Sequence, residues 1–140
     1  MKILKGVLFW IISLTWGGLM TYLGLIISLV LLIAGYKPKK FGYGFYFEIG
    51  NNWGGLELGA VFLANNNPSL HLKQHEAGHG IQNLMLGAFM PFVISIPSAV
   101  RYHYRKWLVK TGRKKITDLS DYDSIWFEKW ATKSGKKHFK

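Results

Sequence analysis

An uncharged apolar run fills the first quarter of the chain. Residues 6–36 contain no Asp, Glu, Lys or Arg, and two lysines precede them. A single helix of this length would measure about 45 Å, whereas the hydrocarbon core of a bilayer is about 30 Å thick. The run therefore predicts either one strongly tilted helix or a helix that breaks. Gly17 and Gly18 are the weakest point, because glycine is a poor helix former.

A break would divide this run into two helices of different kinds. Residues 7–16 would lie at the membrane interface, where their two tryptophans act as anchors. A second helix over residues 19–33, or 19–36, would cross the bilayer. The single tilted helix remains the alternative, and under both interpretations residues 1–36 form a membrane anchor.

A β-hairpin is predicted immediately after the apolar run. Aromatic and β-branched residues alternate with small ones on both sides of the sequence GNNWGG. This pattern indicates strands over residues 41–49 and 56–63, joined by a turn over residues 51–55. The strands carry Glu48 and Glu57, which we expect to face solvent or to line a binding subsite.

A helix and an apolar connector are predicted after the hairpin. Residues 70–86 indicate a helix that begins at the N-cap Ser69. Residues 87–100 are apolar, but Pro91 and Pro97 interrupt them. We therefore expect this second segment to be a buried or membrane-embedded connector.

The remaining C-terminal segment is basic and polar. Its pattern predicts a last helix over residues 124–133, which Asp121 or Asp123 can cap and Gly135 ends. Together these elements predict an α+β fold, in which a small domain over residues 37–140 follows the N-terminal transmembrane or interfacial helix.

The amino-acid composition limits the kinds of molecule that this protein is expected to bind. The chain of 140 residues is 49% hydrophobic and carries a formal net charge of +11, with 18 Lys and Arg against 7 Asp and Glu. A basic protein commonly binds nucleic acid or an anionic membrane surface. The apolar run favours the lipid bilayer, and no nucleic-acid recognition motif accompanies the charge, so nucleic acid is not expected. The absence of cysteine excludes disulfides and thiolate metal sites.

One short motif contains residues that could bind a metal ion and catalyse hydrolysis. His75, Glu76 and His79 form the pattern H-E-x-x-H within the predicted helix. Residues four apart lie on one helix face, so two imidazoles can bind one Zn²⁺ ion while the glutamate accepts a proton from water. Gly78 and Gly80 each cost about 1 kcal/mol relative to alanine in a helix. We expect them where a small residue allows close backbone packing.

A catalytic zinc site takes three protein ligands, so one further ligand is required. Glu128 is the only carboxylate among three aromatic residues of the predicted last helix, where a bare charge would be costly. A ligand role would offset that cost, whereas the alternative is a surface glutamate paired with a neighbouring lysine. The full set of downstream candidates is His103, Asp118, Asp121, Asp123, Glu128 and His138.

The two segments QHEAGHGIQNLMLGAFMPFVISIPSAV and YDSIWFEKWATKSG resemble a family of small bacterial metallopeptidases. The similarity covers residues 36–135 and is gluzincin-like, with two helix histidines and a glutamate from a later helix. It implies a zincin-like domain in which His75, His79 and Glu128 bind the metal and Glu76 is the base. It implies no particular substrate.

Two positions depart from the family pattern. Thr132 stands where the family has asparagine four residues after the late glutamate, and Ser134 stands where it has leucine. In gluzincins the first of these positions often supports a metal-binding histidine. Thr132 can still accept a hydrogen bond, although that support is expected to be weaker. We expect His71, four residues before the motif, to be a cap or a supporting group.

The sequence leaves two features of the expected peptidase undetermined. An oxyanion donor can come from Tyr102, His103, Tyr104 or Tyr122, and the sequence selects none of them. The hairpin can accept a substrate peptide as an added strand, or it can simply pack on the following helix.

The sequence thus predicts a zinc metallopeptidase in the bacterial cytoplasmic membrane that cleaves a peptide or a membrane protein. Lys37, Lys39, Lys40 and the basic tail outweigh Lys2 and Lys5, so the catalytic part is expected in the cytoplasm. The alternatives are a non-catalytic metal-binding membrane protein and a basic adaptor at the membrane surface. Retention of the motif glutamate favours hydrolysis, because a structural metal site does not need it.

Overall fold

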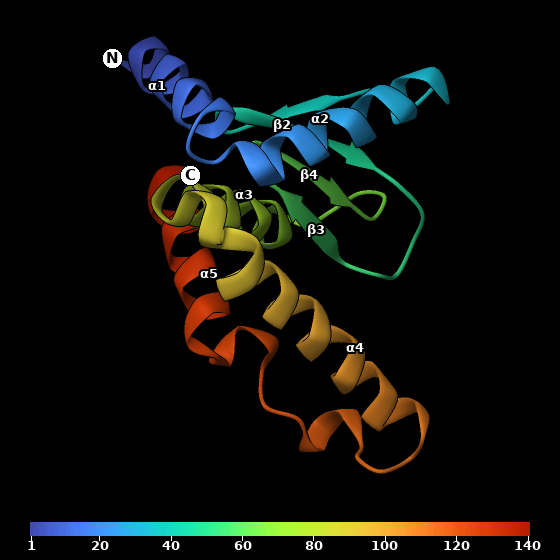
Figure 1. Ribbon diagram of the computed structural model, residues 1–140. Helices are drawn as coiled ribbons and strands as arrows, with labels where there is room; N and C mark the ends of the chain where they lie inside the picture. Colours follow the sequence, from blue (N-terminus) through green and yellow to red (C-terminus); the bar gives the residue numbers. More distant parts are fainter.

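The computed structural model describes all residues of the chain and has an α+β fold (Figure 1). The apolar run forms two helices, α1 (Lys2–Leu14) and α2 (Gly18–Ile33), which meet at an angle of 97°. The single tilted helix is therefore wrong, and the break falls beside the expected glycine pair. No helix is by itself long and apolar enough to cross a membrane, although two bent helix pairs meet the length and composition criteria together.

A four-stranded mixed sheet replaces the predicted single hairpin. The strands β1 (Lys39–Phe41), β2 (Gly44–Glu48), β3 (Gly55–Leu58) and β4 (Val61–Ala64) lie in the order β1-β2-β4-β3. The chain reverses tightly between β1 and β2 and between β3 and β4, and both pairs are antiparallel.

The expected turn is in fact a crossover between strands that do not pair. Gly42 and Gly59 adopt φ values of +61° and +72°, which glycine reaches without steric cost, and they supply the two tight reversals. The GNNWGG segment then carries the chain from β2 to the far edge of the sheet. As a result β2 pairs with β4 in parallel, and β3 becomes an edge strand.

The helix predicted over residues 70–86 is confirmed as α3 (Leu70–Leu86). The Ser69 side chain accepts a hydrogen bond of 3.1 Å from the Leu72 amide, so it is the N-cap. The apolar connector is helical throughout. A turn of π-helix (Pro91–Ser95) leads into α4 (Ile96–Lys110), and the α3 and α4 segments bend by 115°.

The last helix, α5 (Trp126–His138), is longer than predicted. Its N-cap is Ile125, and neither of the two expected aspartates caps it. Gly135 lies inside α5 and does not end it. A Cβ at Gly135 would collide with the Gln74 carbonyl group of α3, so this glycine serves close packing between the two helices.

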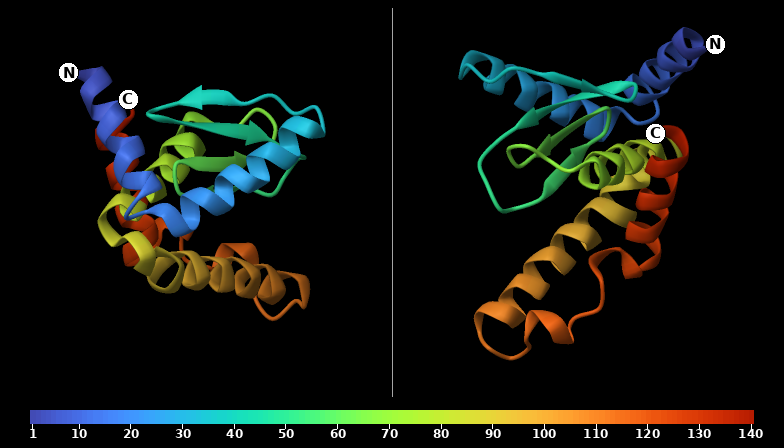
Figure 2. Two further views of the ribbon diagram at one scale, coloured as in Figure 1. Left: turned by 45° about the horizontal axis from the view of Figure 1, so that its top comes forward. Right: turned by 180° about the vertical axis from the view of Figure 1, so that it is seen from behind.

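The crossing of α3 and α5 uses small residues from both helices. A Cβ at Gly78 would collide with the Ala131 carbonyl oxygen of α5. A Cβ at Gly80 would lie 3.0 Å from the carbonyl oxygen of Gly59 in the β3–β4 turn. The expected packing role of both motif glycines is therefore confirmed. α3 lies between the sheet and α5, and both neighbours approach its backbone closely (Figures 1 and 2).

The main apolar core lies where α2, the sheet, the connector and α5 meet. Its buried members are Met20, Leu58, Met90, Ile94 and Phe127. α2 approaches the β3–β4 hairpin closely, since a Cβ at Gly24 would lie 2.9 Å from the Leu58 side chain. The N-terminal helices thus pack directly on the part of the fold that carries the site.

Candidate metal centre

Three buried side chains converge where the helices α3 and α5 cross. His75 and His79 come from α3, and Glu128 comes from α5. The Nε2 atoms of the two histidines lie 3.1 and 3.0 Å from the same carboxylate oxygen, Glu128 Oε2. One potential ligand atom from each residue lies within 4.8 Å of the others, so this group can hold a metal ion.

The local sequence explains the convergence. The histidines are four residues apart and therefore share one face of α3. Glu128 is 0% exposed, so the alternative of a surface glutamate paired with a lysine is wrong. Gly78 and Gly135 allow the two backbones to approach, which brings a short carboxylate within reach of both imidazoles.

A hydrogen-bonded chain orients His75. Its Nδ1 atom lies 2.8 Å from Thr132 Oγ1, and the Thr132 hydroxyl donates a 2.6 Å hydrogen bond to Asp123 Oδ2. Because that hydroxyl proton is directed to the carboxylate, the threonine oxygen accepts from Nδ1–H. His75 Nε2 is the ring nitrogen that faces Glu128. His71 Nε2 lies 3.0 Å from Asp123 Oδ2, so His71 is a supporting group as expected.

His79 is oriented in the same way by a residue that the sequence interpretation left without a role. Gln82 Oε1 lies 2.6 Å from His79 Nδ1, and Gln82 Nε2 donates a 2.8 Å hydrogen bond to the Phe127 carbonyl. The amide is thereby fixed as an acceptor toward the imidazole. A signal was present, because Gln82 lies three residues after His79 on the same helix face.

The second oxygen of Glu128 is also held. The Ser98 hydroxyl of α4 donates a hydrogen bond to Glu128 Oε1. All three candidate ligands therefore have a partner outside the group, which is typical of metal sites. Ser98 and the Asp123 relay were not predicted, because they depend on how α4 and the loop before α5 fold back on the site.

Only one of the four candidate oxyanion donors reaches this centre. The Tyr122 hydroxyl lies 3.3 Å from Ser98 Oγ, and its ring centroid lies 6.3 Å from that of His75. Tyr102 instead donates to the Trp53 carbonyl, and His103 and Tyr104 are exposed on α4.

Charges inside the site are strongly coupled. Burial lowers the pKa of His79, but its hydrogen bond to Glu128 and the charges of Glu76 and Glu128 outweigh burial and raise that pKa to about 9. Burial raises the pKa of Glu128, but hydrogen bonds from His75 and His79 outweigh it and hold the pKa well below its usual range. The carboxylate is therefore ionised and ready to bind a cation.

Glu76 lies beside the ligand group and against the edge of the sheet. It is buried, and burial raises its pKa above the ordinary value for a glutamate. A Cβ at Gly55 of β3 would lie 2.6 Å from Glu76 Oε1, so this carboxylate packs directly against the glycine. Glu76 thus stands between the candidate metal site and an edge strand.

Glu57 of β3 departs from its expected position. Its side chain is buried and not solvent-facing, and it accepts a 2.5 Å hydrogen bond from the Gly59 amide. Burial raises the pKa of Glu57 to about 7. Glu48 is half-buried and pairs with Lys39 of β1 at 2.9 Å. The other downstream ligand candidates, His103, Asp118, Asp121, Asp123 and His138, lie outside the metal-binding group.

Comparisons with protein-family models, curated proteins and solved structures found no match for this chain. The resemblance to small bacterial metallopeptidases therefore remains a prediction.

Proposed function

We propose that the protein is a membrane-associated zinc metallopeptidase with a zincin-like site. The observation that carries this proposal is the convergence of two imidazole Nε2 atoms on one carboxylate oxygen, beside the buried Glu76. Two histidines and one glutamate form a known ligand set of catalytic zinc. The 3.0–3.1 Å separations are close to the ~3.3 Å between donors of a tetrahedral site with ordinary zinc bonds.

The residues around the ligands fit hydrolysis. A bound zinc ion would supply Lewis-acid polarisation and would lower the pKa of water. Glu76 accepts a proton from the attacking water and returns it to the leaving amine, and its raised pKa suits both steps. Burial raises the pKa of Tyr122 to about 12, so its hydroxyl stays protonated and can donate to the developing oxyanion.

The edge strand favours an extended peptide as substrate. β3 pairs with β4 on one side only, and its Gly55 contacts the proposed base. An extended chain that adds to this edge would hydrogen-bond through its backbone and would lie beside Glu76. The excess of lysine around residues 37–40 supports a location at the cytoplasmic face of a bacterial membrane.

A non-catalytic metal-binding protein is the second candidate. The deep burial of all three ligands favours it, because structural metal sites are closed. The two functions differ in their need for Glu76, which a structural site does not use.

Hydrolysis of a quenched fluorogenic peptide library by the zinc-loaded protein separates these functions. Glu76→Gln should retain zinc and lose turnover by several orders of magnitude, because only the base is removed. Turnover by Glu76→Gln equal to that of the wild type would exclude the base role. No turnover by either protein, with zinc bound to both, would favour the structural site.

A further inference from the structure

The two longest segments of the chain without Asp, Glu, Lys or Arg are both bent. They are residues 6–36 and residues 77–100. The first contains the 97° bend between α1 and α2, and the second contains the 115° bend between α3 and α4. Each bend therefore lies inside an uncharged segment, and charged residues occur only before and after that segment.

The two bends interlock, although about 70 positions separate them. The Trp16 indole lies against Gly87, where φ is +55° and a Cβ would collide with the ring. Trp16 Nε1 donates a 3.4 Å hydrogen bond to the Met85 carbonyl, and the Trp16 and Phe89 rings meet edge to face at 6.0 Å. The bends thus form one structural unit.

Part of the backbone at the first bend is hydrogen-bonded within the protein. The Gly17 and Gly18 amides donate to the carbonyls of Ile12 and Thr15 at 2.9 and 3.2 Å. The Asn83 side chain donates a 3.1 Å hydrogen bond to the Gly17 carbonyl. Water would satisfy these groups on an ordinary surface, whereas lipid cannot, so internal pairing is required for a break at membrane depth.

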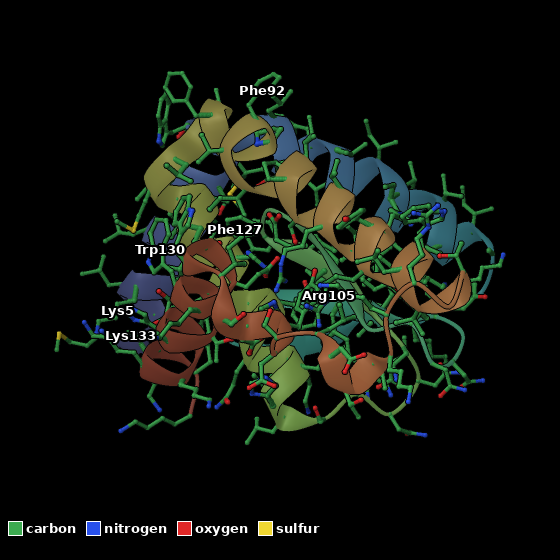
Figure 3. The ribbon with its side chains drawn as sticks, turned by 90° about the horizontal axis from the view of Figure 1, so that it is seen from below. Lys5, Phe92, Arg105, Phe127, Trp130 and Lys133 are labelled. Carbon is green, nitrogen blue, oxygen red and sulfur yellow. The ribbon has the colours of Figure 1, made fainter.

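The side chains around this unit are apolar and exposed. Phe92 is 68% exposed and points away from the rest of the molecule, beside the blue ribbon of α2 (Figure 3). α2 and the start of α4 lie along the same side of the fold (Figure 2, left). The exposed apolar residues are Trp16, Leu19, Leu23, Ile26, Leu29, Val30, Met85, Phe89, Phe92, Val93, Ile96 and Val100. We call these residues the apolar face.

Positive charges lie at both ends of the α1–α2 pair and on α4 beyond the second bend. Lys2 and Lys5 lie at the start of α1, and three lysines follow α2 at residues 37–40. Arg101 and Lys110 lie on α4, beyond the second bend. An apolar surface with a rim of basic residues matches an anionic phospholipid leaflet, in which acyl chains lie beneath negative headgroups.

We propose that the two bends insert together into one leaflet of an anionic bilayer, as a re-entrant wedge that does not cross the membrane. Both ends of each bent pair then remain on the same side, where the basic residues contact headgroups. The rival arrangements are an α1–α2 pair that crosses the bilayer, and an apolar face that is covered by protein.

The wedge also places the candidate metal centre close to the membrane. Ile96 and Val100 share one face of α4, while Ser98 lies on the opposite face and binds Glu128. The centre is therefore about one helix diameter, ~10 Å, from the apolar face. If the proposed peptidase function holds, its substrates are peptide bonds near the membrane surface.

The absence of native cysteine makes this arrangement directly testable. Lys2→Cys, Lys37→Cys and Lys110→Cys would each be exposed to a membrane-impermeant maleimide in spheroplasts and in inverted vesicles. All three should react from the same side, because a re-entrant wedge returns each chain end to the side it left. Reaction of Lys2→Cys and Lys37→Cys from opposite sides would overturn the proposal, since α1–α2 would then cross the membrane.

Lipid contact is measured with purified full-length protein in vesicles of phosphatidylcholine and phosphatidylglycerol. A fluorophore on Phe92→Cys should be quenched several-fold more by doxyl-labelled phospholipid than the same fluorophore on Ile116→Cys. Ile116 is the matched control, because it is 74% exposed and lies on the loop between α4 and α5. Equal quenching at both positions would show that water or protein covers the apolar face, and the wedge would be rejected. Neither experiment depends on zinc or on hydrolysis.

Discussion

Thr132 Oγ1 of α5 lies 2.8 Å from His75 Nδ1, and the Thr132 hydroxyl donates a hydrogen bond to Asp123. This contact fixes the imidazole so that Nε2 faces Glu128. Thr132→Ala should therefore lower zinc affinity about 10- to 100-fold, as removal of such supporting groups usually does. Competition with a zinc chelator measures the change.

Thr132→Ser supplies the control for this prediction. Serine keeps the hydroxyl, so its zinc affinity should stay close to that of the wild type. If the alanine and serine variants bind zinc equally well, the hydroxyl has no supporting role.

Glu128 should couple metal binding to folding. It comes from a helix 49 positions after His79, so only the folded chain brings all three ligands together. Glu128→Ala should lower both zinc affinity and the melting temperature of the zinc-loaded protein. Glu128→Asp shortens the side chain by about 1.5 Å and should weaken zinc binding less.

Lys129→Ala is the control for Glu128, because Lys129 is exposed on the same helix. It should leave zinc affinity and melting temperature unchanged. Full zinc affinity in Glu128→Ala, together with its loss in His103→Ala, would instead indicate a three-histidine site.

Gly135 should resist replacement although it lies inside a helix. Alanine is a better helix former than glycine by about 1 kcal/mol, so propensity alone predicts that Gly135→Ala is stabilising. The collision with the Gln74 carbonyl predicts the opposite, a loss of about 1–3 kcal/mol. Thermal unfolding in detergent shows whether Gly135→Ala raises or lowers the stability of the protein.

Gly6→Ala is the matched control for Gly135→Ala. Gly6 lies in α1, where an added Cβ would meet only Tyr43 at an ordinary 3.8 Å. Gly6→Ala should therefore be neutral or stabilising. A stabilising effect of Gly135→Ala as well would contradict the close crossing of α3 and α5.

Glu57 should make stability depend on pH. Its pKa is about 7 in the folded protein and near 4.5 in the unfolded chain, because burial penalises its charge. Between these values the folded state holds a proton that the unfolded state has lost. The stability that neutral Glu57 contributes is thus complete below pH 4.5 and declines as the pH rises to about 7.

Glu57→Gln should remove this decline, because glutamine stays neutral throughout. The difference in melting temperature between metal-free wild type and Glu57→Gln isolates the contribution of this residue. Glu48→Gln is the control. The hydrogen bond to Lys39 lowers the pKa of Glu48, so replacing Glu48 cannot abolish the decline in stability between pH 4.5 and about 7. A wild type and a Glu57→Gln variant with the same pH dependence would disprove the raised pKa.

The sequence predicted the elements that depend on local periodicity. α3 with its Ser69 cap and a late helix that carries Glu128 were expected, and the break beside Gly18 was one of two alternatives. The sheet was not predicted correctly, because strand pairing is decided by contacts between distant residues. GNNWGG has the composition of a turn, yet the actual reversals occur at Gly42 and Gly59.

For some residues the local sequence fits two structural roles, and only the tertiary structure shows which role applies. Gly135 looks like a helix terminator but is a packing position within α5. Glu57 stands in an alternating strand but faces inward to the Gly59 amide. The Ser98 and Asp123 contacts could not be predicted, because they arise where α4 and the loop before α5 meet the site.

The most direct test of the account is the zinc content of purified protein, measured by mass spectrometry after equilibrium dialysis. The wild type should hold about one zinc per chain, and His75→Ala and His79→Ala should each lose it. Glu76→Gln should retain the metal, because the base is not a ligand. Full zinc occupancy in both histidine variants would contradict the metal centre formed by His75, His79 and Glu128.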